Sequence, residues 1–132
     1  MKLMPMTMGH ALQMLKWKNY PETRKFAIVS HKIISKSNHC KWLRGNLQYF
    51  QVILEKGKVC GAIRVQDKEV SIWIDRTFWD QGIAQKTIKK VSKKGFTAKI
   101  VEGHIVSMRC FINCGYLPVS YQGGYYIFQC TI

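Results

Sequence analysis

The chain has 132 residues, which is enough for one domain with a single hydrophobic core and too few for two. Its 21 Lys and Arg residues against 7 Asp and Glu residues give a formal net charge of +14, so its surface should attract anions in general. No apolar run is long enough to cross a bilayer, and five cysteines without a secretory leader favour reduced thiols in the cytoplasm over a disulfide framework.

The first half of the sequence predicts a strand, three helical segments and a β-hairpin. Apolar residues recur at helical spacing in the first of these helices, where Leu12, Met14 and Leu15 are expected to face inward. The predicted segments are, in chain order, a strand at 1–6, helices at 10–18, from Pro21, and from Ser35 or Ser37 to Leu43, and strands at 49–54 and 59–65 joined by the glycine-containing turn 55–58.

The second half alternates strands and helices. After a strand at 70–74, Ala84, Ile88 and Val91 share one helical face that we expect to be buried, and Gly95 ends the helix. Further strands are predicted at 98–101, 116–121 and 125–130, with a helix ending at Gly115. This order predicts one α/β domain over residues 1–132, with a mixed, mostly antiparallel central sheet that contains a parallel strand pair flanked by helices.

The junction between the strand at 70–74 and the helix that follows it indicates a ligand site. Gly82 and Ala84 open the helix, and small residues there let the backbone approach a ligand closely. The first N–H groups of a helix are free to bind an anion, and a row of lysines starts at Lys86. Neither a Walker loop nor a dinucleotide-binding fingerprint is present. We therefore expect a phosphate-bearing ligand at this junction.

Three segments resemble the GNAT acetyltransferases. The window Trp79–Ala84 is similar to their acyl-CoA loop, [QR]-x-x-G-x-[GA], although tryptophan stands where Gln or Arg is usual. The longer stretch WIDRTFWDQGIA is most similar to the branch that acetylates ribosomal-protein N-termini. Residues 100–116 (IVEGHIVSMRCFINCGY) fit the pattern N-x-x-[SA]-x-x-x-[FY]-x-x-x-G-[FY], with histidine in place of Asn. Residues 14–33 resemble the opening of GNAT enzymes that acetylate nucleotide-linked amino sugars.

The resemblance implies a GNAT-like fold and direct acetyl transfer from acetyl-CoA, without a metal, to a small-molecule or peptide amine. Backbone N–H groups near the glycine would hold the pyrophosphate, and the strand before the loop would pair with the pantetheine arm. Two acceptors stay open, a nucleotide-linked amino sugar and a protein N-terminus, with Arg24, Lys25, His31, His39 and Trp42 expected at the acceptor wall. The expected cofactor-binding residues are Trp73, Ile74, Asp75, Gln81, Gly82, Ile83, Ala84, Lys86 and Phe111.

The catalytic groups are implied by position within the family pattern. Glu69 is the first candidate for the general base, although a solvent-facing strand-edge glutamate is an equal reading; Glu102 and His104 compete with it. Phe111 occupies the position where many members carry a tyrosine acid, and phenylalanine has no proton to donate. Ser107, on the same helical face, is a substitute proton donor. Tyr116 and solvent are the other candidates for this role.

Other classes of function fit parts of the same sequence. A catalytically degenerate CoA-binding protein is one alternative, because the acid position holds phenylalanine. A small basic nucleic-acid-binding domain is another, but no RNP-type aromatic signature, GXXG loop, zinc-finger spacing or basic-region heptad supports nucleic acid as the partner. Cys110 and Cys114 are expected to be core thiols rather than half of a metal site. The apolar last strand, YYIFQC, predicts a homodimer formed through the C-terminal hairpin.

Overall fold

The computed structural model describes residues 1–28 and 31–132; positions 29 and 30, which belong to the segment 14–33 discussed above, lie outside the described residues. One seven-stranded sheet has the order β1-β2-β3-β4-β5-β7-β6. Its strands are β1 (Lys2–Pro5), β2 (Phe50–Glu55), β3 (Lys58–Gln66), β4 (Glu69–Ile74), β5 (Thr97–Val101), β6 (Tyr116–Gln122) and β7 (Tyr125–Cys130). The helices are α1 (Ala11–Lys18), α2 (Pro21–Lys25), α3 (Lys36–Arg44), α4 (Ile83–Val91) and α5 (Ile105–Asn113), with 3₁₀ turns η1 (Met8–His10), η2 (Leu47–Tyr49) and η3 (Arg76–Phe78).

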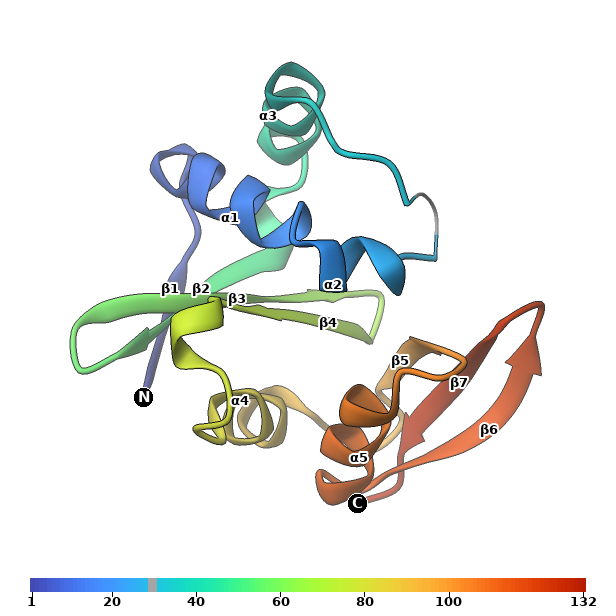
Figure 1. The fold of residues 1–132 in the computed structure, drawn as a ribbon. Coiled ribbons are helices and arrows are strands. Elements are labelled where there is room, and N and C mark those ends of the chain that lie inside the picture. The colour runs from blue at the N-terminus through green and yellow to red at the C-terminus, as the bar shows by residue number, and fades with distance from the viewer. Residues whose placement is uncertain (29–30) are drawn as a thin grey trace.

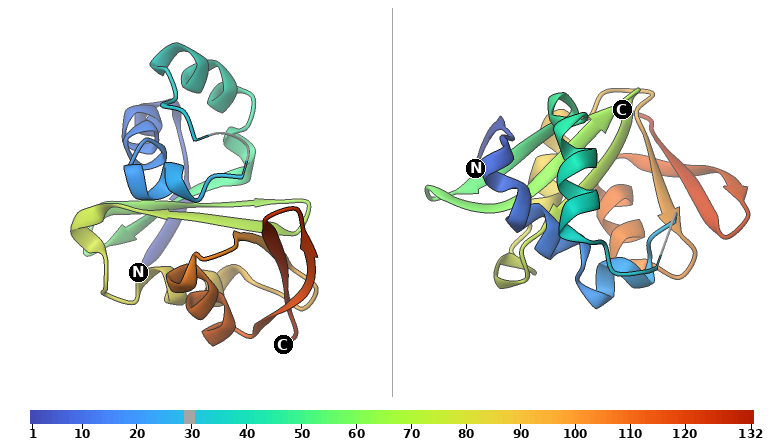
Figure 2. Two further views of the ribbon diagram at one scale, coloured as in Figure 1. Left: turned by 45° about the vertical axis from the view of Figure 1, so that its right-hand side comes forward. Right: turned by 90° about the horizontal axis from the view of Figure 1, so that it is seen from above.

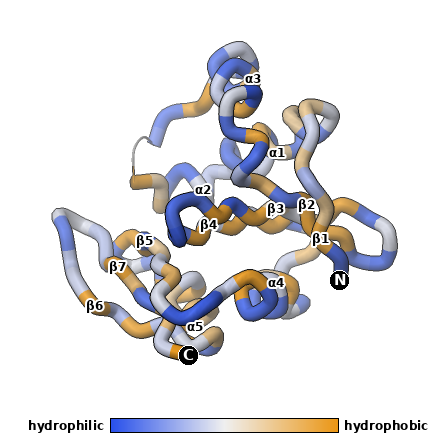
Figure 3. The backbone as a smooth tube through the Cα atoms, turned by 180° about the vertical axis from the view of Figure 1, so that it is seen from behind, coloured by the Kyte–Doolittle hydropathy of each residue, from blue (hydrophilic) through white to orange (hydrophobic). Residues whose placement is uncertain are grey.

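Helices cover both faces of the sheet. In Figures 1 and 2, α1, α2 and α3 lie on one side of β2–β4, and α4 and α5 lie on the other. Two main clusters of buried side chains correspond to these layers, one containing Trp17, Leu43 and Phe50, the other containing Ile88, Phe111 and Phe128. Hydrophobic positions recur along β2, β3 and β4, between the helix layers (Figure 3). β2, β3 and β4 therefore alternate their side chains between the cores on the two faces of the sheet.

The sheet confirms the predicted fold class. Its ladders are antiparallel except for the one between β4 and β5, which is parallel and, within the described residues, consists of the single pair Glu69–Thr97. The Thr97 N–H donates to the Lys68 carbonyl at 2.8 Å and fixes this register. Beyond that pair the two strands do not continue as a ladder, so the sheet consists of a β1–β4 part and a β5–β7–β6 part.

Local signals place the turns and caps. The β2–β3 and β3–β4 turns have their central residues at positive φ, at 51° and 78° for Lys56 and Gly57 and at 52° and 67° for Asp67 and Lys68. Two-residue loops of this kind match the twist of the flanking strands. The predicted cap of α3 is also present, because the Ser35 hydroxyl accepts a hydrogen bond from the Asn38 N–H at 3.2 Å.

Several predicted side-chain orientations are wrong. In α1, Leu12 is 58% exposed and Leu15 is half-buried, because Ala11, Met14 and Trp17 form the face that packs on the sheet. The buried residues of α4 are Ile83, Thr87 and Ile88, whereas Ala84 and Val91 are only half-buried. Met14 and Ile88 are buried as expected, but the rest of each buried face is offset, because Trp17 of α1 and Ile83 of α4 occupy the core.

The C-terminal hairpin is placed differently from the expectation as well. β7, the strand YYIFQC, lies between β5 and β6, so it is not an edge. The edge strand is β6, whose Leu117, Val119 and Tyr121 are 52%, 55% and 51% exposed. Within the described residues, no helix combines the length and the apolar character needed to span a bilayer.

Candidate functional site

The loop from β4 to α4 ends in an open, uncapped helix N-terminus. Gly82 is the N-cap of α4, with φ 73°, and makes no side-chain cap. The first helical hydrogen bond runs from the Lys86 N–H to the Gly82 carbonyl, so the N–H groups of residues 83–85 are not used within the helix. A Cβ at Gly82 would meet no atom within 4 Å. This geometry can accept an anion on backbone donors, at the positive end of the helix dipole.

A hollow of about 390 Å³ lies beside this helix start. Three residues expected at the cofactor, Gln81, Ile83 and Lys86, line it, although Ile83 itself is buried in the core. Lys56 and Lys58 of the β2–β3 turn also line it and were missed by the sequence reasoning. The pattern Lys-Gly-Lys was visible, but nothing local shows that this turn folds next to α4.

The Asp75 carboxylate holds the first part of the loop against α1. Its Oδ1 accepts from the Thr77 N–H at 3.0 Å and from the Thr77 hydroxyl at 2.7 Å. Its Oδ2 accepts from the Trp17 indole N–H at 3.0 Å and lies 3.7 Å from the Lys16 ammonium. Burial alone would raise the pKa of Asp75, but the hydrogen bonds from Trp17 and Thr77, with the Lys16 charge, lower it below its ordinary value.

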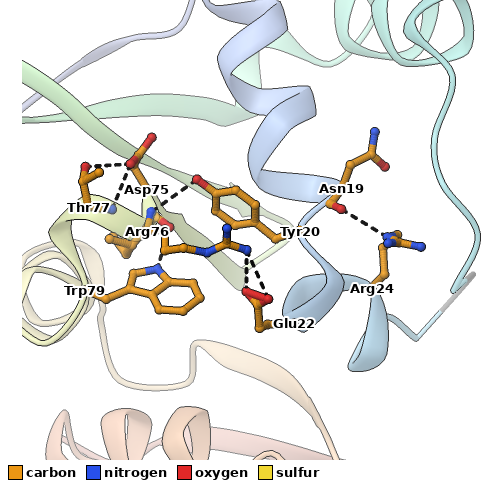
Figure 4. A network of polar contacts seen from close by, with 9 residues as sticks. Asn19, Tyr20, Glu22, Arg24, Asp75, Arg76, Thr77 and Trp79 are labelled. Carbon is orange, nitrogen blue, oxygen red and sulfur yellow. Dashed lines mark hydrogen bonds and ion pairs between the residues drawn. The ribbon is translucent and has the colours of Figure 1, made fainter.

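Arg76 makes a second connection, to α2 and the residue before it. Its guanidinium Nη2 donates to both carboxylate oxygens of Glu22, at 3.1 and 2.8 Å (Figure 4). The backbone N–H of Arg76 donates to the Tyr20 hydroxyl at 3.3 Å. The guanidinium also lies over the Tyr20 ring, 4.2 Å from its centroid. Hydrogen bonding to Arg76 lowers the pKa of Glu22. The loop is therefore fixed to the α1–α2 layer at two points.

Trp79 closes the loop back onto β4. Its indole N–H donates to the Ile74 carbonyl at 2.9 Å, and its ring meets Tyr20 edge-on with centroids 6.1 Å apart. Tryptophan shares a side-chain N–H donor with Gln and Arg, the usual residues at this position of the resembled pattern. The departure from the pattern thus keeps the donor while changing the side chain.

Backbone alternation decides which groups of β4 face the β5 side. The Asp75 N–H donates to the Cys60 carbonyl of β3 at 2.7 Å. Because alternate residues of a strand direct their backbone groups to opposite neighbours, Trp73 also pairs with β3, whereas Ile72 and Ile74 face β5. Past the Glu69–Thr97 pair, β5 does not pair with them. The open backbone therefore belongs to Ile72 and Ile74 rather than to Trp73 and Asp75; the Trp73 ring packs 5.9 Å from Phe50.

Glu69 stands at the single parallel pair, on the face covered by α1–α3. Its carboxylate lies 3.4 Å from the Lys99 ammonium and 3.9 Å from Arg64 Nη1, and its side chain is 28% exposed. It is thus a partly covered, ion-paired carboxylate, between the two readings that its sequence position allowed.

His104 and Ser107 lie at the other end of β5. The four residue steps of the strand place them more than roughly 13 Å from the Glu69–Thr97 pair. The His104 ring stacks on Phe26, with centroids 4.1 Å apart and planes at 3°, and burial lowers its pKa. Ser107 is half-buried in the first turn of α5. The structure does not bring these two residues together with Glu69 as one cluster.

Phe111 and the α5 cysteines belong to the core. Phe111 packs edge-on against Tyr116, with centroids 5.0 Å apart, and the Tyr116 hydroxyl lies 2.6 Å from the Ser92 hydroxyl. Burial raises the pKa of Cys110 to about 11, and Cys114 is buried as well. Across residues 1–28 and 31–132, no group of three or more His, Cys, Asp or Glu side chains is placed to hold a metal ion.

The expected acceptor wall is only partly an open surface. His39 is buried, with its Nε2 3.0 Å from the Ala11 carbonyl and its Nδ1 without a hydrogen-bond partner. Arg24 donates to the Asn19 carbonyl at 3.1 Å and so fixes the α1–α2 junction. Lys25 and His31 are exposed, and Trp42 is 38% exposed.

The Asp75 contacts generate a stability prediction. We expect Asp75→Asn to lower the free energy of unfolding by about 1–3 kcal/mol at pH 7, because an amide replaces a carboxylate that accepts from Trp17 and Thr77. Since the folded-state pKa of Asp75 is lowered, its stabilisation is complete above the ordinary Asp pKa of about 3.9 and is lost as pH falls through the lowered value.

Urea unfolding of the parent and Asp75→Asn at pH 7 and at pH 3 measures this difference. The exposed turn variant Asp67→Asn is the control and should stay within about 0.5 kcal/mol of the parent. A pH-independent difference between Asp75→Asn and the parent would contradict the role given to the charge.

Comparison with known proteins supports the fold but no closer relationship. No protein-family model and no curated protein matches the sequence. A domain from Methanocaldococcus jannaschii is 17% identical, with 99% of this chain and 97% of that chain covered and a TM-score of 0.80. The ribosomal-protein-alanine N-acetyltransferase from Brucella melitensis is 14% identical over 100% of both chains, with a TM-score of 0.75. A putative acetyltransferase from Salmonella typhimurium, solved with its cofactor acetyl-CoA, is 16% identical over 99% and 93%, with a TM-score of 0.75. The chain therefore has a GNAT-like α/β fold.

Proposed function

We propose that this protein is an N-acetyltransferase that moves the acetyl group of acetyl-CoA to a primary amine by direct attack in a ternary complex. One observation carries the proposal: the uncapped start of α4 lies one loop after β4, and the β4 backbone at Ile72 and Ile74 has no partner strand on the β5 side. The first feature suits a pyrophosphate and the second suits an amide-containing arm, and acetyl-CoA has both groups in this order. The Salmonella structure holds acetyl-CoA on the same fold.

The cofactor would lie along β4. Its pyrophosphate would accept from the N–H groups after Gly82, with Lys86 one turn further along α4. Its pantetheine amides would pair with Ile74 and then Ile72, as an added strand would. The Ile74 carbonyl already accepts from the Trp79 indole, so the arm would share or displace that hydrogen bond. The thioester would then lie toward Glu69.

The chemistry requires one proton removed and one supplied. In the proposed reaction, Glu69, directly or through a water, takes the proton of the attacking amine, and a C–N bond forms. A backbone N–H of β4 stabilises the oxyanion of the tetrahedral intermediate. The C–S bond then breaks, and the thiolate takes a proton from solvent, because Phe111 lies in the core without a hydroxyl and Ser107 lies more than roughly 13 Å from the Glu69–Thr97 pair. His104, which burial keeps neutral at pH 7, remains a competing base.

The acceptor is an amine, and two kinds remain in the proposal. The Brucella match, a ribosomal-protein-alanine N-acetyltransferase, favours a protein N-terminus. The resemblance of residues 14–33 to amino-sugar acetyltransferases favours a nucleotide-linked sugar. Since Phe111 supplies no proton, a CoA-binding protein without turnover is the second candidate. It would bind acetyl-CoA at the same residues as the enzyme.

Calorimetric titration with acetyl-CoA tests the cofactor site. We expect one site per chain, with binding that persists at moderate salt, and Gly82→Trp should weaken it about 100-fold or more, roughly 3 kcal/mol, by filling the space before the helix start. Gly95→Trp is the matched control, because Gly95 also has positive φ, 93°, and open space at its Cβ position, but follows α4. Binding unaffected by Gly82→Trp, or heat that vanishes with salt in both proteins, would refute the site.

Steady-state kinetics test the base. Glu69→Gln should lower kcat about 10²–10⁴-fold and leave the affinity for acetyl-CoA unchanged, because the carboxylate contacts the amine rather than the cofactor. Glu102→Gln and His104→Gln are compared in the same assay. A large loss in either one, with Glu69→Gln active, would reassign the base. Binding of acetyl-CoA without transfer to any amine would establish the second candidate.

We propose that the expected homodimer forms by pairing of β6 with its copy in a second chain. Residues 116–130 carry no charged side chain, in a chain of net charge +14, and Leu117, Val119 and Tyr121 are exposed along this edge strand. An uncharged apolar edge can pair with its copy without charge repulsion. Sedimentation equilibrium should show a dimer that Val119→Lys dissociates. The mass of a single chain for the parent at high protein concentration would contradict this proposal.

A further inference from the structure

Two cations on the α1–α3 face of the sheet, Lys18 and Arg64, are incompletely paired with anions, because Arg64 shares its one carboxylate with Lys99. Lys18 is the last residue of α1, and its ammonium lies 3.9 Å from the centroid of the Trp42 ring. The side chain is partly buried, and among the ion pairs of the described residues none involves Lys18. Burial and, to a lesser extent, the charge of Arg64 lower the pKa of Lys18 to about 8.

Arg64 is the second of these cations. It lies on β3, beside β4, and its guanidinium contacts the Gln66 amide oxygen and, at 3.9 Å, the Glu69 carboxylate. Its Nε–H is buried and has no hydrogen-bond acceptor. Lys99 approaches Glu69 from β5, so Arg64 and Lys99 share one carboxylate. Lys18 lies on the same face of the sheet, because the Trp42 ring that it covers packs on Phe50, the cross-strand partner of Arg64. The positive charge of this cluster exceeds its negative charge by two.

The surroundings make this excess of charge costly. Trp42 packs edge-on against Phe50 at 5.7 Å, and Phe50 packs against Trp73 at 5.9 Å, so an aromatic row lies under the Lys18 side. A partly desolvated cation without an anion, and a buried N–H without an acceptor, each cost free energy. A ligand that carries anionic oxygens would satisfy both groups at once.

We infer that Lys18 and Arg64 form an anion subsite for the acceptor, so that the acceptor is an amine that also bears a carboxylate or phosphate group. The inference rests on the proposed function, in which the amine lies at Glu69. Since Arg64 contacts Glu69, the amine and the anionic group of the acceptor must be a few bonds apart. Short amines with an anionic end therefore fit this surface better than neutral amines of the same length.

Matched acceptors test the subsite. O-phosphoethanolamine, β-alanine and ethanolamine share a two-carbon amine and differ in a phosphate, a carboxylate or a hydroxyl end. Acetyl transfer is followed by the release of the CoA thiol. We expect kcat/KM for at least one anionic amine to be about 10- to 100-fold higher than kcat/KM for ethanolamine. Preference for phosphoethanolamine or for β-alanine identifies which anion the subsite takes.

Variants locate the effect. Lys18→Met, which keeps the apolar stem over Trp42, should lower the kcat/KM of the anionic amines to that of ethanolamine measured with the same variant. Arg64→Gln should also abolish the preference for anionic amines, measured as the ratio of their kcat/KM to that of ethanolamine, because its contact with Glu69 can change the absolute rates. Lys41→Met is the control, because Lys41 is exposed on α3 and its loss changes the net charge by the same amount. Anionic amines acetylated equally well by Lys18→Met and the parent would overturn the inference.

A binding measurement separates this inference from the proposed function. Phosphoethanolamine and β-alanine are titrated by calorimetry into the parent and Lys18→Met, each saturated with CoA. Loss of binding in Lys18→Met supports the subsite even if no amine is acetylated, a result that would refute only the proposed turnover. Equal transfer to ethanolamine and the anionic amines overturns the subsite and leaves the acetyltransferase proposal intact. Neither binding nor transfer of the anionic amines also overturns the subsite.

Discussion

The Asp75 carboxylate is the contact on which the arrangement of the site depends. It follows β4 directly, so it stands where the strand ends and the loop must turn. By accepting from Thr77 it shapes the turn, and by accepting from Trp17 it attaches that turn to α1. Arg76 and Trp79 then continue the same attachment through Tyr20 and Glu22. The loop reaches Gly82 already oriented, and the open start of α4 follows from this.

The second constraint is the short parallel ladder. α4 carries the chain from the end of β4 back to the start of β5, and the strands meet at Glu69 and Thr97. The backbone groups of Ile72 and Ile74 are consequently left facing β5 without a partner strand. An unpaired strand edge in the middle of a sheet is costly unless water or a ligand pairs with it. Glu69, Arg64 and Lys99 gather at the closed end of this edge.

Much of the fold could be predicted because its signals are local. Ser35 caps α3 by itself, and two-residue turns with positive φ set the hairpins. The orientation of α1 could not be predicted, because the inward position of Trp17 depends on a hydrogen bond to Asp75, which is 58 residues away in the sequence. Nor could the Ile72 and Ile74 backbone be chosen over Trp73 and Asp75, since that choice depends on the hydrogen-bond register with β3.

The candidate site was predictable where one segment supplies it and not where several do. The helix start at Gly82 lies within a single stretch of sequence. The Lys56–Lys58 turn beside it, and the approach of Lys18 to Arg64, join elements that no spacing relates. Phe111 and His39 fitted plausible roles by position, yet packing places both in the interior. Burial is decided by the whole chain, so a pattern of residue types does not reveal it.

The single Glu69–Thr97 pair also has a consequence for how the protein opens under native conditions. Backbone hydrogen bonds make each part of the sheet cooperative within itself, whereas the two parts are joined by one ladder pair, by side-chain packing and by the stack of Phe26 on His104. Opening of the β5–β7–β6 part would therefore break few backbone bonds to β4. The amides of β2 and β3 and those of β7 should accordingly exchange with solvent deuterium as two separate cooperative units, each with its own opening free energy.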